Sequence, residues 1–273
     1  MSEILHRTLL QRATFEVIPL GGVSEKTRLI DPGSMISVTA SPTRGTAATV
    51  DLALDLQAQG HRAVPHLSAR MIEDRQELAR IIERLDQGGV TRVFVAGGDG
   101  DRHGAYFDAI SLLRDMTDLG HPFREVGIAG YPEGHPIIPD ALLRQALIDK
   151  QPYATYVVTQ MCFAPGTIVG WVRDLRADGV VLPVELGVPG AVDATRLLAM
   201  STRIGVGDSM RFLAKNRRAI LRLLRPGRYS PDRLIVAMAS LGEGLGLRGT
   251  HIFTFNQVAP TMAWHRRSLQ RLS

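Results

Sequence analysis

Short runs of β-branched and apolar residues alternate with amphipathic stretches along most of the 273-residue chain. The helical spacing is clearest in residues 73–87, where leucines and isoleucines recur three and four positions apart. Residues 153–162 are instead rich in Val, Thr and Tyr, which favour a strand. The alternation of the two patterns predicts a chain in which strands and helices follow one another.

Eight strands are predicted, at residues 13–20, 34–40, 62–67, 90–96, 125–131, 153–162, 180–186 and 250–255. Helices are predicted at residues 47–59, 73–87, 104–119, 139–149, 168–177, 191–203, 207–224 and 231–241, and the chain ends in a basic helical segment. This order and length match an α/β protein with a single (β/α)8 TIM barrel, one domain over residues 1–273. A doubly wound open sheet stays open, because a strand count from sequence is easily wrong by one.

The composition is that of a folded globular protein, with 45% hydrophobic and 22% charged residues, and it excludes a disordered chain. No stretch is apolar enough for a membrane helix, and the N-terminal segment lacks the pattern of a signal peptide. The single cysteine, Cys162, excludes an internal disulfide and favours a reducing compartment. We therefore expect a cytoplasmic protein without a membrane partner.

The net charge of +5 is unevenly distributed. Residues 203–273 carry 13 Lys and Arg against 3 Asp and Glu, whereas the other 202 residues carry 19 against 24. Such a basic segment is either a solvated helix face or a surface that attracts anions. Nucleic acid is not expected as a partner, because aromatic residues are only 5% of the chain and no known nucleic-acid-binding motif is present.

In a barrel, functional residues gather where the strands end at their C-terminal edge. Polar residues stand at these predicted ends: Glu16, Thr39, His66, Asp99, Tyr131, Glu133, His135, Gln160 and Asn256. No metal site is expected, because the eight histidines form no HExxH motif and no Cys/His ligand spacing.

The most informative run is Gly-Tyr-Pro-Glu-Gly-His-Pro at residues 130–136, in which two prolines stiffen a loop that follows a strand. Further landmarks are FEVIP at 15–19, SVT at 37–39, PHL at 65–67, GGD at 97–99, TQMCF at 159–163 and HIFTFN at 251–256. With these seven motifs in order, the chain resembles the methylenetetrahydrofolate reductase family over most of its length.

The resemblance implies reduction of 5,10-methylenetetrahydrofolate to 5-methyltetrahydrofolate by NADH or NADPH. Glu16 would be the general acid that protonates N10 and opens the imidazolidine ring, so that the N5 iminium can accept hydride. Asp99 would also belong to the catalytic set, and Asp99, Gln160 and Phe163 would bind the folate. In this reading the basic residues Arg211, Lys215, Arg217 and Arg218 would steer anionic folate tails and nucleotide phosphates toward the barrel mouth.

The family resemblance also implies FAD, with Thr39, His66, Gly98, Tyr131 and His135 at cofactor-binding positions. Two features depart from the family pattern. Gly97 replaces an arginine that precedes Gly-Asp, and the helix positions that would offer charged groups to FAD fall at Leu142, Gln145, Ile148 and Asp149. Two routes therefore stay open, one through FAD and one with direct hydride transfer from the nicotinamide to the folate.

Other functions remain open at this stage. A folate-dependent methyl or one-carbon transferase, or a demethylation-linked folate enzyme, could use the same barrel and the same pterin without redox chemistry. The sequence also leaves open whether the chain forms a homo-oligomer.

Overall fold

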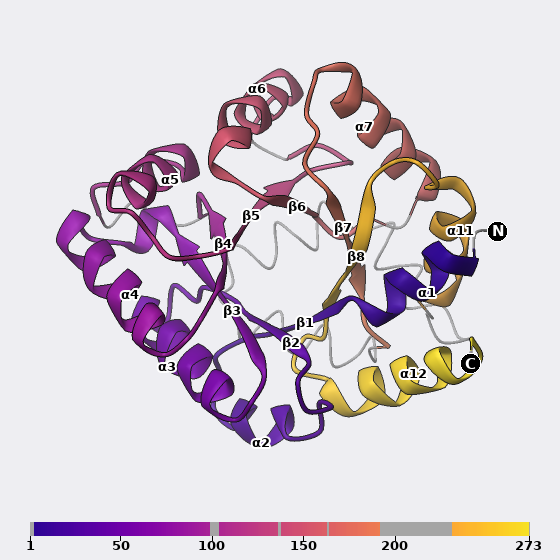
Figure 1. Ribbon diagram of the computed structural model, residues 1–273, viewed down its shortest axis with the longest axis horizontal. Coiled ribbons are helices and arrows are strands. Elements are labelled where there is room, and N and C mark those ends of the chain that lie inside the picture. Colours follow the sequence, from indigo (N-terminus) through magenta and orange to yellow (C-terminus); the bar gives the residue numbers. More distant parts are fainter. Residues whose placement is uncertain (1–2, 99–103, 136–137, 163, 192–230, 273) are drawn as a thin grey trace.

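Eight parallel strands close into a barrel in the order β1 to β8, with helices packed around it (Figure 1). The computed structural model describes residues 3–98, 104–135, 138–162, 164–191 and 231–272. Within these residues each strand hydrogen-bonds to its neighbours in sequence order, and β1 also pairs with β8. This closure confirms the predicted (β/α)8 barrel and excludes the open sheet.

The strands are β1 (Ala13–Val17), β2 (Met35–Val38), β3 (Arg62–Ser68), β4 (Arg92–Ala96), β5 (Glu125–Gly130), β6 (Tyr156–Thr159), β7 (Val184–Pro189) and β8 (Leu247–Phe253). The α-helices are α1 (Glu3–Gln11), α2 (Val23–Thr27), α3 (Gly45–Ala58), α4 (Arg75–Gln87), α5 (Ala109–Asp118), α6 (Asp140–Lys150), α7 (Pro165–Ala177), α11 (Asp232–Leu241) and α12 (Val258–Gln270). Two short 3₁₀ turns are η1 (Ala69–Met71) and η2 (Gln151–Tyr153).

The structure corrects several predicted boundaries. The seventh strand begins at Val184 rather than at residue 180, because Pro183 has no N–H to donate to a ladder. The sixth begins only after the turn η2, and α5 begins after a capping box formed by Asp108 and Ser111. Helices α1 and α2 were not predicted.

The helices predicted at residues 191–203 and 207–224 lie, apart from Ala191, outside the described residues. So do Arg211, Lys215, Arg217 and Arg218. Among the helices that the structure describes, none is long and apolar enough to cross a bilayer.

Alternation along a strand such as β1 separates two environments. In β1, the apolar side chains of Phe15 and Val17 face the surrounding helices, where Phe15 packs edge-on against His265 of α12 with ring centroids 5.0 Å apart. Thr14 and Glu16 instead face the barrel interior, where both meet residues of other strands. A residue inside the barrel can therefore meet side chains from strands far away in sequence.

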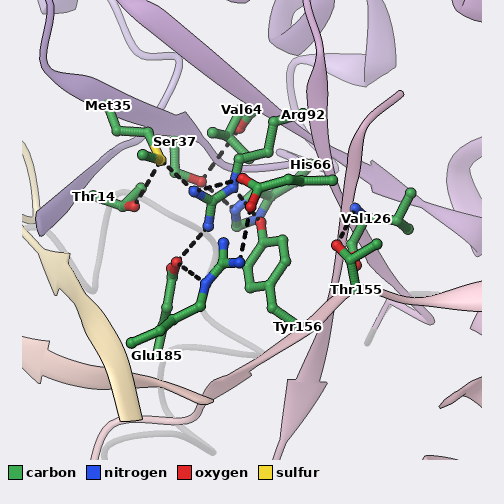
Figure 2. A network of polar contacts seen from close by, with 12 residues as sticks. Thr14, Met35, Ser37, Val64, His66, Arg92, Val126, Thr155, Tyr156 and Glu185 are labelled. Carbon is green, nitrogen blue, oxygen red and sulfur yellow. Dashed lines mark hydrogen bonds and ion pairs between the residues drawn. The ribbon is translucent and has the colours of Figure 1, made fainter. Parts of the chain in front are cut away.

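The barrel interior near the N-terminal ends of the strands is charged rather than apolar. Figure 2 shows part of this region, with Arg92, Tyr156 and Glu185 as sticks. Arg92 of β4 donates to Glu185 of β7 at 2.6 Å and to the hydroxyl of Tyr156 at 2.9 Å. Arg248 of β8 donates to Glu185 at 2.9 Å and to Glu125 at 2.8 Å. We call these five residues the basal network.

The basal network is tightly packed. The Arg92 and Arg248 guanidinium carbons lie 4.1 and 4.2 Å from the Tyr156 ring centroid. Burial raises the pKa of Tyr156 to about 12, so its hydroxyl stays protonated. Room for this ring comes from Gly127, where an added Cβ would lie 2.3 Å from the Tyr156 Cζ. The network fills the end of the barrel opposite the edge at which a (β/α)8 protein builds its active site.

Candidate active site

Three ionisable side chains meet near the C-terminal ends of the strands. Oε2 of Glu16 lies 2.9 Å from Nε2 of His251 on β8 and 3.9 Å from Nε2 of His66 on β3. The Glu16 side chain keeps 14% of its surface exposed, whereas that of His251 keeps 4%. Glu16 is therefore held from within the barrel and can still be reached by a small molecule from solvent.

The backbone of Glu16 is fixed by the segment after β8. Thr254 donates to the Glu16 carbonyl through its hydroxyl, at 2.5 Å, and Asn256 bonds both the N–H and the C=O of Ile18. Phe255 and Asn256 adopt left-handed φ angles of 49° and 56°, which are rare for residues other than glycine. These bonds hold the strained turn against the backbone of Glu16 and Ile18, so the turn fixes the main chain from which the Glu16 side chain projects.

His66 is the third member of the cluster. Its Nε2 lies 2.6 Å from the hydroxyl of Ser37 on β2, and that hydroxyl also lies 3.3 Å from the carbonyl of Val64. Burial lowers the pKa of His66 to about 4; the negative charge of Glu16 opposes this effect and His251 adds to it. His66 is therefore neutral near pH 7 and is bound to Ser37 rather than to Glu16.

The neutral state of His66 predicts a pH dependence of stability. Between a folded pKa of about 4 and the ordinary 6.5, the unfolded chain binds more protons than the folded one. Lowering the pH from about 7.5 to about 5 should thus cost the wild type roughly 2 kcal/mol more unfolding free energy than His66→Gln, which cannot titrate. Urea unfolding of both proteins at the two pH values measures this difference, and equal losses would contradict the assignment. Other buried histidines titrate in both proteins and cancel.

The positions expected to hold a cofactor lie around the same edge. Thr39 follows β2 and donates its N–H to the Val17 carbonyl. Gly98 has a φ of +90°, and a Cβ there would lie 2.4 Å from the Ser68 hydroxyl oxygen, so a larger residue would strain the backbone and displace the Ser68 side chain. Tyr131 and His135 follow β5 and meet edge to face, with ring centroids 5.2 Å apart.

The expected folate ligands are only partly described. Gln160 is exposed at the end of β6, where its backbone N–H donates to the carbonyl of Gly130. Asp99 and Phe163 lie outside the described residues. The expected roles of all three remain predictions.

A groove of about 500 Å³ runs between α6 and α7, below the loop that holds Tyr131. Among the described residues that line it, the charged groups are three carboxylates, those of Glu133, Asp140 and Asp174, and the guanidinium of Arg144. Arg144 already lies 3.2 Å from Asp178 and 3.8 Å from Asp174. The groove thus offers acceptors and negative charge, and its one guanidinium is already paired with acids.

Two residues around Glu16 were not predicted as site residues from the sequence: His251, a member of the cluster, and Ser37, which is hydrogen-bonded to His66. Both lie within motifs that were noted, but neither stands at a predicted strand end. Alternation along β8 gave no sign of His251, because Arg248 and His251 are three positions apart and both face the barrel interior, so the HIFTFN motif was the signal that could have indicated it.

The ligand atoms of Glu16, His66 and His251 lie within 4.8 Å of one another, close enough for one divalent ion to reach all three. The sequence spacing gave no sign of this arrangement. In the described geometry, however, the reachable nitrogen of His66 is bonded to Ser37 and that of His251 to Glu16.

Comparisons with known proteins agree with the motifs. Residues 24–205 match the family model described as methylenetetrahydrofolate reductase. Methylenetetrahydrofolate reductase 2 of Saccharomyces cerevisiae is 24% identical over 173 residues, which are 59% of this chain and 27% of the yeast protein. A probable methylenetetrahydrofolate reductase (NADPH) of Caenorhabditis elegans is 33% identical over 86 residues, 30% of this chain and 13% of that protein. The match thus spans about a quarter or less of these relatives.

A solved structure shares the whole fold. It is an uncharacterized protein from Clostridium thermocellum, described as binding two copies of 5-methyl-5,6,7,8-tetrahydrofolic acid. It superposes with a TM-score of 0.64 over 98% of this chain and 99% of its own, at 11% sequence identity. At that identity the similarity establishes the barrel alone.

Proposed function

The chain belongs to the methylenetetrahydrofolate reductase family, and on this premise we propose that it reduces 5,10-methylenetetrahydrofolate to 5-methyltetrahydrofolate. NADH or NADPH supplies the hydride. The observation that carries the proposal is the Glu16 carboxyl, which is partly exposed at the strand ends and hydrogen-bonded from within the barrel by His251.

The reaction requires one proton and one hydride. The protonated Glu16 carboxyl gives its proton to N10, the C–N10 bond of the five-membered ring breaks, and an iminium forms at N5. Hydride from the nicotinamide then adds to the exocyclic methylene carbon, which becomes the methyl group, and NAD(P)⁺ leaves. Glu16 ends as a carboxylate and is reprotonated from solvent, so atoms and charges balance.

FAD is the cofactor that the family resemblance implies, and the described residues fit it poorly. A pyrophosphate needs cations and free N–H donors, but the groove beside Tyr131 holds three carboxylates and an arginine that is already paired. On α6, Leu142 is 60% exposed and Gln145 donates to Asp149. These residues support direct transfer of hydride from nicotinamide to the folate, without a flavin between them.

The direct route predicts that the purified protein has no flavin absorbance and that added FAD leaves its NAD(P)H oxidation rate unchanged. The measurement is a visible spectrum of the gel-filtered protein, before and after incubation with FAD. Flavin that co-elutes with the protein and is bleached by NAD(P)H would contradict the direct route, while leaving the overall reaction in place.

A second candidate is folate-dependent methyl transfer on the same barrel. The Clostridium thermocellum protein of the same fold is described as binding 5-methyltetrahydrofolic acid, a folate that could be the methyl donor of such a transfer and is also the product of the reduction. The two functions differ in their redox chemistry, because a methyl transferase consumes no NAD(P)H.

The deciding assay follows NAD(P)H oxidation with and without methylenetetrahydrofolate and identifies the folate product. The reductase predicts oxidation that depends on the folate and yields one 5-methyltetrahydrofolate per nicotinamide. A folate that is bound without nicotinamide oxidation would favour the transferase.

A further inference from the structure

The Glu16 carboxyl presents two different oxygens. Oε2 points to the interior, where it lies 2.9 Å from His251 Nε2, and His251 is buried with 3% of its surface exposed. A hydrogen bond to a charged carboxylate is stronger than one to a neutral acid, and burial increases the difference. The contact therefore stabilises the carboxylate form of Glu16 more than its protonated form.

We propose that His251 is a positioning residue for the proton transfer: its Nε2–H binds Oε2 of Glu16 and stabilises the carboxylate that remains when the other oxygen has given its proton away. The inference rests on the proposed function. In the step itself the Oε1–H bond of Glu16 breaks and an N10–H bond forms. In this step His251 keeps the Nε2 proton with which it binds Glu16.

Among the described groups around Glu16, His251 is the one placed to stabilise its carboxylate. The titratable side chains that face the carboxyl within the described residues are His251 from β8 and His66 from β3. Ser37 of β2 is neutral and is bonded to His66. The charges of the basal network are bonded to one another at the opposite strand ends.

His66 is the natural comparison. It lies 3.9 Å from the same oxygen, beyond hydrogen-bond distance, and its Nε2 is bonded to Ser37. Because it is neutral near pH 7, it exerts no charge on Glu16 there. Its removal should therefore leave the proton affinity of Glu16 almost unchanged, whereas the removal of His251 should increase it.

The test compares His251→Phe, His251→Gln and His66→Gln with the wild type. Phenylalanine keeps the ring volume without a donor, and glutamine places an N–H donor near the position of Nε2. For His251→Phe we expect the descending limb of the kcat/KM–pH profile to move up by about one pH unit or more, with a lower maximum. His251→Gln should restore the wild-type limb, and His66→Gln should not move it.

A second measurement does not depend on turnover. Carbon NMR of the Glu16 carboxyl follows its titration in the folded protein, and its midpoint should rise in His251→Phe by the same interval. An unmoved midpoint in a folded His251→Phe protein would overturn the inference even if the enzyme reduces folate. So would a stoichiometric divalent metal in the wild type that is lost from His251→Phe. A folate that does not stimulate nicotinamide oxidation, with a midpoint that does shift, would instead overturn the proposed function.

Discussion

Replacing Glu16 with glutamine should lower kcat for NAD(P)H-dependent reduction of methylenetetrahydrofolate by about 10²- to 10⁴-fold, the usual range for a lost general acid. Glutamine has the same shape, and its amide oxygen can still accept the bond from His251. It has no acidic proton for N10, so the ring should stay closed and the iminium should not form. Stopped-flow or steady-state nicotinamide oxidation measures the effect.

Two controls separate chemistry from structure. The unfolding free energy and the folate dissociation constant of Glu16→Gln should stay close to those of the wild type, because the contacts of the side chain are conserved. Glu16→Asp keeps an acid but withdraws it by one methylene from His251, and it should retain more activity than Glu16→Gln. Full activity in Glu16→Gln would remove Glu16 from the mechanism.

The largest effect on stability should come from Glu185→Gln in the basal network. This carboxylate is 3% exposed and accepts from both Arg92 and Arg248. Its loss leaves two largely buried guanidinium groups with Glu125 as their remaining carboxylate. Breaking a buried ion pair from one side costs about 3–5 kcal/mol, and we expect a loss of that size in urea unfolding.

The matched control is Arg84→Gln, which breaks the ion pair between Arg84 and Asp51 on the exposed faces of α4 and α3. These side chains are 47% and 60% exposed, so the change should stay within about 1 kcal/mol. Equal effects of Glu185→Gln and Arg84→Gln would mean that the basal network contributes no more to stability than a surface pair.

The barrel could be predicted from the sequence because its signals are local. The period of residues 75–87 predicts a helix, and the β-branched residues of β6 predict a strand. Counting such segments in order gives the barrel. Helix α2 was missed because it has five residues, too few to display a helical period.

The contact between Glu16 and His251 could not be predicted from the sequence, because it forms only when the barrel closes. Glu16 and His251 are 235 positions apart and meet only where β1 pairs with β8. The basal network has the same origin. Glu125 begins the predicted fifth strand and Glu185 stands near the end of the predicted seventh, and only the closed barrel brings them to Arg92 and Arg248.

The fate of the transferred hydride tests the proposed reduction most directly. NADH or NADPH with deuterium at the transferable position of the nicotinamide is given to the enzyme together with methylenetetrahydrofolate, and the folate product is analysed by mass spectrometry. We expect 5-methyltetrahydrofolate with one deuterium in its methyl group, formed in step with NAD(P)⁺ and almost absent with Glu16→Gln. Unchanged labelled nicotinamide in the presence of folate, or a methyl group without deuterium, would contradict direct hydride transfer to the folate.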